Sequence, residues 1–435
     1  MIVANNASPQ QVVSALQDFV AQNTSPLWVA FSGGLDSTVL LHALTQLRLS
    51  NPKLNLTAVY VHHGLQAAAD DWQSHCKQIC DNWLVTFFAI PVEVKAVARQ
   101  GIEAVARQKR YEAFAHLIRD QGVLLTAHHQ RDQAETVLMA LARGSGVQGL
   151  SGMTPETDKT FQSTQLHQAR PLLNVPYEAL LAYATEHQLF WVEDPSNQNI
   201  DFKRNFVRHE ILPKFNQAWS FSEQNIALSA SLLHESASLL EQLALIDVGD
   251  KNCSVYGLDL QVLDGLDWAR QKNVLQYWFQ THLKLGINQS IFEWLRHTLA
   301  SYRSSSSPSF ALANGYVLRI HGFSLYCLCQ AELGRPYHYD FENFSKLSLR
   351  YPFKTLISPK WFLSHQVDFA WLREGLSIRS IHPSDLQAMP GLKTWFKNHK
   401  IAPWLREIWP VLAYENQLVA ILGFKTLSQY QNPPV

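Results

Sequence analysis

The sequence predicts an α/β protein that begins with a doubly wound parallel sheet and continues with a helical middle domain and a small mixed α/β C-terminal domain. Over the first 215 residues, continuous apolar runs alternate with amphipathic stretches, which is typical of parallel strands covered by helices on both faces. From about Gln217 long helical periods replace this alternation, and short apolar runs broken by proline and glycine return near the end. We therefore expect three domains, at 1–215, 216–340 and 341–435.

The length and composition are those of a globular protein with several domains. The chain has 435 residues, of which 47% are hydrophobic and 17% charged, which excludes a fibrous or mostly disordered protein. The five cysteines cannot all pair and are not densely spaced, which favours a reducing compartment. No run approaches ~18 apolar residues, and the first ten residues do not resemble a signal peptide. We expect a cytoplasmic protein that does not span a membrane.

Four apolar runs in the first domain are each followed by an amphipathic stretch of helical length. The runs are LWVAFS at 27–32, LNLTAVYVHH at 54–63, LVTFFAIPV at 84–92 and VLLTAHH at 123–129. Alternating strands and helices of this kind form right-handed crossovers in a parallel sheet. Ligands of such sheets bind beyond the carboxyl ends of the strands, so the residues that follow each run are the candidates for a functional site.

In the middle domain, leucines at positions 228, 232, 239 and 243 recur near helical spacing.

The segment SGGLDS stands between the first predicted strand and the first predicted helix. Its two glycines let the backbone turn tightly and bring N–H groups close to a phosphate, and the following helix N-terminus adds positive partial charge. The segment lacks the lysine of a Walker A loop and carries Asp36, whose carboxylate is tolerable beside phosphates when Mg²⁺ bridges the two. We predict Asp36 as a Mg²⁺ ligand, with a helix cap as the structural alternative. The predicted nucleotide-binding residues are Ser32, Gly33, Gly34, Leu35, Asp36 and Ser37.

SGGLDS resembles the pyrophosphate-binding loop of the ATP pyrophosphatases, and six further segments narrow the resemblance. They are HHGL at 62–65, EAVARQKRYEAF at 103–114, AHHQRDQAET at 127–136, RGSGVQGLSGM at 143–153, RPLL at 170–173 and EDPSNQNIDFKRNFVRHEILP at 193–213. Together they are similar to the bacterial tRNA(Ile)-lysidine synthetase family, over residues 27–215. The segment LKTWFKNHKIAPWLREIWP at 392–410 resembles the C-terminal domain of that family.

This resemblance implies a fold of the adenine-nucleotide α-hydrolase type and a ligase that depends on ATP and Mg²⁺. Members of the family adenylate the wobble cytidine of the isoleucine tRNA with a CAU anticodon and release pyrophosphate. Free L-lysine then attacks the activated carbon through its ε-amine, which releases AMP and leaves lysidine. The resemblance implies a catalytic first domain, a middle domain that recognises the tRNA and a C-terminal domain that binds it. It leaves the oligomeric state open between a monomer and a homodimer.

Charged side chains near the third and fourth runs suit the two steps of this reaction. Arg107 and Arg110 offer fixed donors for the charge on the reacting phosphates; a solvated helix face is the alternative. Asp132 and Glu135 are three residues apart on one face of a predicted helix, where they would bind the ammonium group of lysine and accept its proton. A capping role for this carboxylate pair is the alternative. His128 and His129 are predicted to hydrogen-bond ATP or the flipped base.

Basic residues of the last domain are candidates for contact with tRNA phosphates. The net charge is −2 over residues 1–215, −4 over 216–345 and +6 over 346–435, so a polyanion is expected to contact the last part. Compositional drift and, for two of three interleaved tryptophans, a hydrophobic core are the alternatives. The predicted contacts there are Lys393, Lys397, Lys400 and Arg406, and a second predicted basic face carries Lys203, Arg204 and Arg208.

Two other functions are compatible with parts of this pattern. Another enzyme with this loop, such as a tRNA thiolase or an amidating synthetase, would need a cysteine cluster or a source of ammonia, and no motif for either is evident. A non-catalytic protein that binds tRNA and senses the nucleotide would bind RNA without releasing pyrophosphate.

Overall fold

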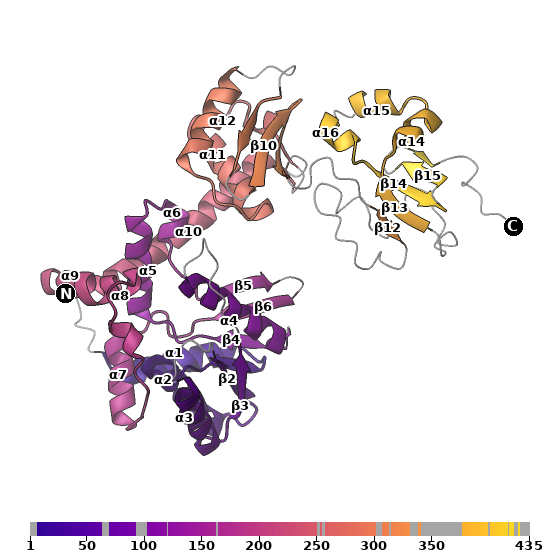
Figure 1. The fold of residues 1–435 in the computed structure, drawn as a ribbon. Coiled ribbons are helices and arrows are strands. Elements are labelled where there is room, and N and C mark those ends of the chain that lie inside the picture. Colours follow the sequence, from indigo (N-terminus) through magenta and orange to yellow (C-terminus); the bar gives the residue numbers. More distant parts are fainter. Residues whose placement is uncertain are drawn as a thin grey trace. The chain divides into compact units, whose positions relative to one another are not determined.

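The protein is described by a computed structural model, in which contacts divide the chain into two compact units, Met1–Ser238 and Leu239–Val435. Figure 1 shows the helices and strands of each unit. Within the described residues, no helix combines the length and the apolar character that crossing a membrane requires. The structure describes residues 7–62, 69–92, 102–119, 121–161, 164–249, 253–254, 257–301, 307–312, 315–330, 338–340, 376–398, 401–415, 417–421 and 425–426.

The first unit contains a six-stranded sheet in the order β3-β2-β1-β4-β6-β5. Its strands are β1 (Leu27–Ala30), β2 (Leu56–His62), β3 (Thr86–Pro91), β4 (Val123–Leu125), β5 (Glu156–Phe161) and β6 (Thr164–Ala169). Neighbours from β3 to β6 pair in parallel, and β5 pairs antiparallel with β6 at the edge. The predicted parallel sheet is confirmed, and the polar β5 is an edge strand that the apolar pattern did not predict. The strand order reverses between β1 and β4, where ligands of such sheets bind.

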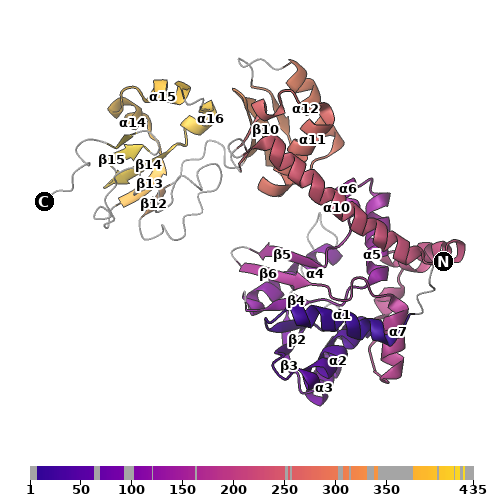
Figure 2. The same cartoon turned by 180° about the vertical axis from the view of Figure 1, so that it is seen from behind.

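Helices cover both faces of this sheet (Figures 1 and 2). Alternate residues of β2 belong to two separate apolar clusters, with Ala58 and Tyr60 in one and Val59 and Val61 in the other, because successive side chains of a strand point to opposite faces. Burial on both faces explains why β2 is a continuous apolar run. The helices are α1 (Pro9–Gln22), α2 (Leu35–Ser50), α3 (Ala69–Asn82), α4 (Ile102–Ile118), α5 (Gln130–Ala142), α6 (Val147–Leu150) and α7 (Tyr177–Glu186).

A helix with one wide turn follows the sheet. α8 (Lys203–Phe206) leads into a π-helical turn, Val207–Ile211, and then into α9 (Leu212–Ala218). In the wide turn the Leu212 N–H donates to the Val207 carbonyl, five residues back. Pro213 follows directly, and a proline inside a helix lacks the N–H donor and clashes with the carbonyl four residues back. We attribute the wide turn to this proline.

A buried histidine joins α2 to α7 in the core of the first unit. His42 Nδ1 lies 3.0 Å from the Tyr183 hydroxyl oxygen, and the ring centroids of His42 and His187 are 4.9 Å apart. Burial, with a smaller contribution from His187, lowers the pKa of His42 from 6.5 to about 4. The ring is therefore neutral in the folded protein at physiological pH.

The free energy of unfolding of the first unit is expected to fall as the pH drops from 6.5 to about 4. The pKa of His42 is lower in the folded chain than in the unfolded chain, so the unfolded chain gains the proton first and is favoured by acid, by about 3 kcal/mol at most. Urea unfolding at a series of pH values would measure this loss in the native protein and in His42→Gln. The variant should lose less stability in acid, and equal losses in both proteins would contradict the assignment.

The second unit begins within a long helix and continues with an antiparallel sheet. α10 (Ser222–Val248) precedes the strands, and α11 (Trp268–Tyr277) and α12 (Gln289–Ser301) pack against them. The sheet order is β7-β8-β11-β10-β9. The predicted helices are present, and the structure adds this sheet to them. The strands are β7 (Cys253–Ser254), β8 (Gly257–Asp259), β9 (Ser309–Ala311), β10 (Tyr316–His321) and β11 (Ser324–Cys329).

The C-terminal part of the second unit is a small mixed α/β structure, as predicted. Its antiparallel sheet has the order β12-β13-β14-β15-β16, and its core includes Phe396, Trp409 and Val411. The helices are α14 (Pro383–Ala388), α15 (Leu392–Asn398) and α16 (Pro403–Arg406), and the strands are β12 (His338–Asp340), β13 (Leu376–Ser380), β14 (Pro410–Tyr414), β15 (Gln417–Ile421) and β16 (Lys425–Thr426). The residues just after the predicted boundary at 340 lie outside the described residues, and the division into three domains stays a prediction.

Candidate active site

The loop from Ser32 to Ser37 connects the end of β1 to the start of α2. Gly33 has a φ of +79°, and a Cβ at this position would lie 2.9 Å from the Cys76 sulfur. A side chain would therefore be strained in conformation and would collide with α3. The Val192 N–H donates to the Gly33 carbonyl at 2.9 Å, which fixes the loop from the opposite side.

The two serines of the loop bond to the loop itself. The Ser37 hydroxyl donates to the Gly34 carbonyl at 3.1 Å and accepts from the Ser32 N–H at 3.2 Å. Gly34 is the N-cap of α2, and no side chain caps that position, so the first N–H groups of a 16-residue helix face the loop without a capping group. A helix start of this kind is a ready site for a phosphate.

Asp36 lies in the first turn of α2 with one oxygen left without a partner. Its Oδ1 is buried and accepts no hydrogen bond from the described residues, whereas Oδ2 lies 3.6 Å from His129 Nε2. A buried carboxylate oxygen without a donor is costly, and Mg²⁺ prefers such oxygen ligands. The residue therefore fits the predicted metal ligand. In the described part of the chain, no group of three or more His, Cys, Asp and Glu side chains is arranged to hold a metal ion.

Two buried carboxylates on α5 are bound by two arginines from the segment after the sheet. Arg204 donates through Nε to Glu135 Oε2 at 2.6 Å and through Nη2 to Asp132 Oδ1 at 2.8 Å. Arg208 donates through Nε to Glu135 Oε1 at 2.5 Å and through Nη2 to Asp132 Oδ1 at 3.2 Å. Glu135 is 0% exposed and Asp132 is 7% exposed. We call Asp132, Glu135, Arg204 and Arg208 the four-residue ion network.

His129 connects this network to the loop. Its Nε2 lies 3.6 Å from both Asp36 Oδ2 and Asp132 Oδ2. Burial alone would lower the pKa of His129, but the carboxylates of Asp132 and Asp36 raise it above the usual value. Burial alone would likewise raise the pKa of Asp132, but His129 and Arg204 lower it well below its usual range. Asp132 is therefore ionised at physiological pH.

Asp132 also has the structural role that was considered as the alternative. Its Oδ2 accepts a hydrogen bond from the His129 N–H at 3.1 Å, at the start of α5. One oxygen therefore caps the helix while the other binds the two arginines. The Glu135 carboxylate instead accepts from Arg204 and Arg208, and within the described residues it makes no such bond to the start of the helix.

The other predicted catalytic and nucleotide-binding residues of the first unit are Arg107, Arg110 and His128. The Arg107 guanidinium on α4 lies 5.3 Å from the centre of the Tyr111 ring, and its side chain is exposed, whereas Arg110 is half-buried. His128 Nδ1 lies 2.9 Å from Thr126 Oγ1. Burial lowers the pKa of His128 to about 3, with Arg107 among the positive charges that lower it further. His128 is therefore neutral.

Sequence reasoning placed Arg204 and Arg208 with the tRNA contacts and did not connect them to the carboxylates. Their spacing of four residues was the available signal, because it sets both on one helix face. Tyr177 was also missed. Its ring lies 5.4 Å from that of His129 and 4.1 Å from the Arg131 guanidinium, and nothing in the residue type or its spacing indicated this position.

The predicted basic residues of the C-terminal part differ in their surroundings. Lys393 and Lys397 are exposed on α15, and Lys400 lies outside the described residues. Arg406 donates through Nε to the Ile401 carbonyl at 2.8 Å, so part of its side chain has a structural role. Of the three tryptophans, Trp409 is buried in the core, and Trp395 and Trp404 are partly buried against it.

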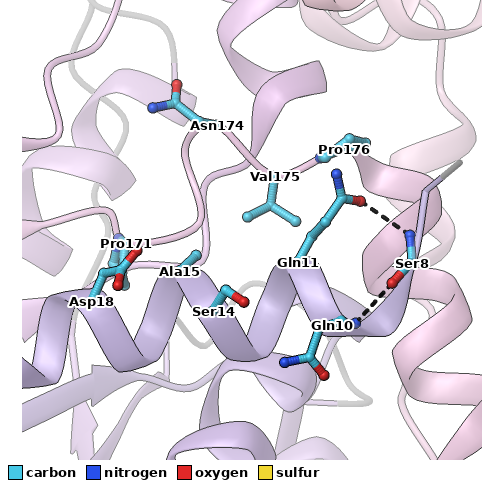
Figure 3. A pocket seen from close by; sticks show the side chains of 10 residues that line it. All are labelled: Ser8, Gln10, Gln11, Ser14, Ala15, Asp18, Pro171, Asn174, Val175 and Pro176. Atoms are coloured by element: carbon cyan, nitrogen blue, oxygen red, sulfur yellow. Dashed lines mark hydrogen bonds between the residues drawn. The ribbon is translucent and has the colours of Figure 1, made fainter. Parts of the chain in front are cut away.

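A cavity of about 650 Å³ lies along α1, and none of the predicted site residues lines it. Figure 3 shows the residues that line it, which come from α1, from Ser8 just before that helix and from the segment 171–176. A second cavity of about 290 Å³ shares Gln11 and Asn174 with the first. No predicted site residue lines either cavity. We therefore place the candidate active site at the carboxyl ends of the parallel strands and not in these cavities.

Comparison with known proteins identifies the domains of the chain. A model described as the PP-loop domain matches residues 6–215, the TilS substrate binding domain matches 258–326 and the TilS substrate C-terminal domain matches 379–434. The tRNA(Ile)-lysidine synthase of Hydrogenovibrio crunogenus is 42% identical over 429 residues, which are 97% of this chain and 100% of that protein. The enzyme of the same name from Edwardsiella ictaluri is 37% identical over 405 residues, 91% of this chain and 90% of that protein.

Among solved structures, the U34-tRNA thiolase NcsA from Methanococcus maripaludis matches 52% of this chain and 78% of its own, with a TM-score of 0.45 and 17% identity. A likeness of that size carries no weight for function. The two lysidine synthases are 42% and 37% identical to this chain and match over nearly their whole length, and this similarity shows that the chain belongs to the tRNA(Ile)-lysidine synthase family.

Proposed function

We propose that the protein is a ligase that uses ATP to adenylate the wobble cytidine of the isoleucine tRNA with a CAU anticodon and then joins L-lysine to it, releasing AMP and pyrophosphate. The observation that carries this proposal is the connection of an anion-binding loop to a buried carboxylate pair. His129 Nε2 lies 3.6 Å from Asp36 in the loop and 3.6 Å from Asp132 on α5. A site for nucleotide phosphates and a site for a cation therefore adjoin each other.

The adenylation step needs an exposed α-phosphorus and a stabilised leaving group. The N–H groups of the loop and the start of α2 would hold the outer phosphates, so that the ring carbonyl oxygen of cytosine attacks the α-phosphorus in line. The bond from the α-phosphorus to the bridging oxygen breaks, and pyrophosphate leaves with the electron pair. Mg²⁺ at Asp36 would neutralise charge on these phosphates, and Arg107 and Arg110 would bind the charge that develops on them.

The lysine step needs a site that binds an ammonium group. Asp132 and Glu135 supply two negative charges, but Arg204 and Arg208 already bind their oxygens. Because its pKa is lowered, Asp132 is a weak proton acceptor and is better suited to bind the ammonium than to deprotonate it. The ammonium gives one proton to Glu135 or to solvent water before its nitrogen can attack. The free amine then forms a bond to the activated ring carbon, the bond from that carbon to the AMP oxygen breaks, and AMP leaves with the electron pair.

Asp132→Asn is expected to slow the lysine step by roughly 100-fold while adenylation falls much less. The change removes a charge that the ammonium needs but leaves the loop residues in place. Single-turnover assays would measure AMP–RNA formation without lysine and lysidine formation after lysine is added. Asp158→Asn, which removes an exposed carboxylate on β5, is the control. Equal loss of both steps in Asp132→Asn would reject the assignment.

The tRNA contacts, the domain roles, the location and the assembly of the protein are also proposals. The exposure of Lys203, Lys393 and Lys397 supports contact with tRNA phosphates, together with Lys400 and Arg406. The middle domain at 216–340 would recognise the tRNA and the domain at 341–435 would bind it. Among the cysteines whose side chains the structure describes, four are free thiols, which supports a reducing, cytoplasmic location. A homodimer is compatible with these assignments and is not required by them.

One mixture tests the function as a whole. The protein is incubated with ATP, Mg²⁺, labelled L-lysine and tRNA with a CAU anticodon, and the label in the RNA is measured. We expect label in the RNA together with equal amounts of AMP and pyrophosphate. Pyrophosphate release without transfer of lysine would favour another enzyme of the loop class, and tRNA binding without pyrophosphate release would favour a non-catalytic nucleotide sensor.

A further inference from the structure

A chain of buried polar side chains leads across the sheet to His128. Gln168 on β6 is 0% exposed, and its Nε2 donates to Thr126 Oγ1 at 2.8 Å and to the Tyr111 hydroxyl oxygen at 3.1 Å. Arg170 Nη2 donates to Gln168 Oε1 at 3.0 Å. Thr126 Oγ1 lies 2.9 Å from His128 Nδ1. We call Arg170, Gln168, Thr126 and His128 the Gln168 network.

The chemistry of the groups fixes the direction of the bonds at Gln168. A guanidinium group has donors and no acceptor, so the amide atom that faces Arg170 must be the oxygen. The amide nitrogen then faces Thr126 and Tyr111, and both of its hydrogens are donated. Thr126 Oγ1 is therefore the acceptor in its bond with Gln168.

The hydroxyl proton of Thr126 must then be donated to His128. Thr126 is 7% exposed, and the described partners of its Oγ1 are Gln168 and His128. Gln168 offers only its N–H group there, so the remaining acceptor is His128 Nδ1. A buried hydroxyl that left its proton unbonded would lose free energy without compensation.

An imidazole that accepts at Nδ1 carries its proton at Nε2 when it is neutral. Burial keeps His128 neutral, because it lowers the pKa of the ring to about 3. We infer that the Gln168 network holds His128 in the Nε2–H form, so that the ring presents a hydrogen-bond donor to the site, and that Gln168 and Thr126 are positioning residues for it. The form of the ring follows from the network alone, whereas its use as a donor to a nucleotide rests on the proposed function.

The Gln168 amide also donates to Tyr111, which contacts the predicted catalytic residue Arg107. The Tyr111 hydroxyl that accepts from Gln168 belongs to the ring beneath the Arg107 guanidinium. A donor at His128 Nε2 suits an oxygen or a ring nitrogen of a nucleotide. The nucleotide is either ATP or the target cytidine of the tRNA. The KM of each substrate, measured in a variant that disturbs the network, distinguishes the two.

The test reads the protonated nitrogen directly. The full chain is labelled with ¹⁵N in its histidine rings, and the His128 signals are assigned by their loss in His128→Asn. Long-range ¹H–¹⁵N spectra near pH 7 should show the Nε2–H form in the native protein. In Thr126→Val, which keeps the shape but lacks the hydroxyl, Nδ1 loses its donor and a mixture with the Nδ1–H form is expected. Thr126→Ser keeps the hydroxyl and should restore the native signal.

Kinetics add a second measurement. Thr126→Val should raise the KM for one substrate by about tenfold, with Thr126→Ser close to native. An effect on the KM of ATP assigns the donor to ATP, and an effect on the KM of tRNA assigns it to the base. A native signal of the Nδ1–H form, or an unchanged Nε2–H form in Thr126→Val, would overturn the inference. Gln168→Leu, which leaves Thr126 without its donor, is the second variant if Thr126→Val does not fold. Because the spectra need no turnover, failure of the proposed function would leave their result intact.

Discussion

The Asp36→Asn enzyme is expected to release pyrophosphate from ATP roughly 100- to 1,000-fold more slowly than the native enzyme. The carboxylate has one buried oxygen without a donor among the described residues, and a bound cation would supply the missing partner. An amide in the same place has no charge to share with Mg²⁺ and the phosphates. Pyrophosphate release would be measured in a single turnover with tRNA and without lysine, because that step precedes the arrival of lysine.

A control carboxylate separates this effect from a general loss of negative charge. Asp18 lines the cavity along α1 and is exposed, and Asp18→Asn should release pyrophosphate at the native rate. The same control tests whether that cavity takes part in the reaction. A native rate in Asp36→Asn would remove Asp36 from the metal site and, with it, the main chemical reason for an acidic residue in the loop.

Glu135→Gln is expected to destabilise the first unit by about 3 kcal/mol or more, which would lower its Tm by roughly 6 to 12 °C. The Glu135 side chain is 0% exposed and accepts from both Arg204 and Arg208. Removing its charge leaves two guanidinium groups close together with only Asp132 to balance them. Because a buried charge without its partner is far more costly than an exposed one, the loss should exceed that of any surface pair. Thermal unfolding followed by circular dichroism measures it.

Glu178→Gln is the matched control for this change. Glu178 also pairs with an arginine, Arg131, at 2.6 Å, but its side chain is 58% exposed. Solvent screens such a pair, so its removal should cost no more than about 1 kcal/mol. If the two variants unfold at the same temperature, the four-residue ion network does not stabilise the fold in the way its burial indicates.

The sheet and the loop could be predicted because their determinants are local in the sequence. A strand buried on both faces must be apolar throughout, as in β2, and a loop that approaches phosphates needs glycine where a Cβ would collide, as at Gly33. β5 has neither feature. It is polar because it lies at an edge, and its place in the sheet follows from pairing with β6 and not from its own residues.

The four-residue ion network could not be predicted in the same way. Asp132 and Arg204 are separated by 72 residues, and nothing in either segment specifies the other as its partner. The spacing of Asp132 and Glu135 correctly placed them on one face of α5, and the spacing of Arg204 and Arg208 placed them on one face as well. Only the folded chain brings the two faces together, which is why a basic face predicted for tRNA lies against buried carboxylates.

The sheet of the middle segment was missed for a further reason. Two of its strands, β7 and β8, have two and three residues, fewer than an alternating pattern needs to be distinguished from a helical one. The two strands β10 and β11 have six residues each and were not recognised beside the long helix. The helical spacing of apolar residues in α10 dominates the pattern of that segment, so a helical structure was also predicted for the residues that form strands.

Pro213 lies outside the candidate active site but, through the wide turn before it, influences the orientation of Arg208 in that site. A π-helical turn contains one residue more than a regular turn, so it rotates everything before it relative to everything after it. Arg208 stands within that turn and reaches Glu135 from there. Replacing Pro213 would allow a regular helical turn, which would rotate Arg208 about the helix axis relative to Glu135. A substitution of Pro213 would thus change the orientation of a side chain in the candidate active site through the geometry of the helix alone.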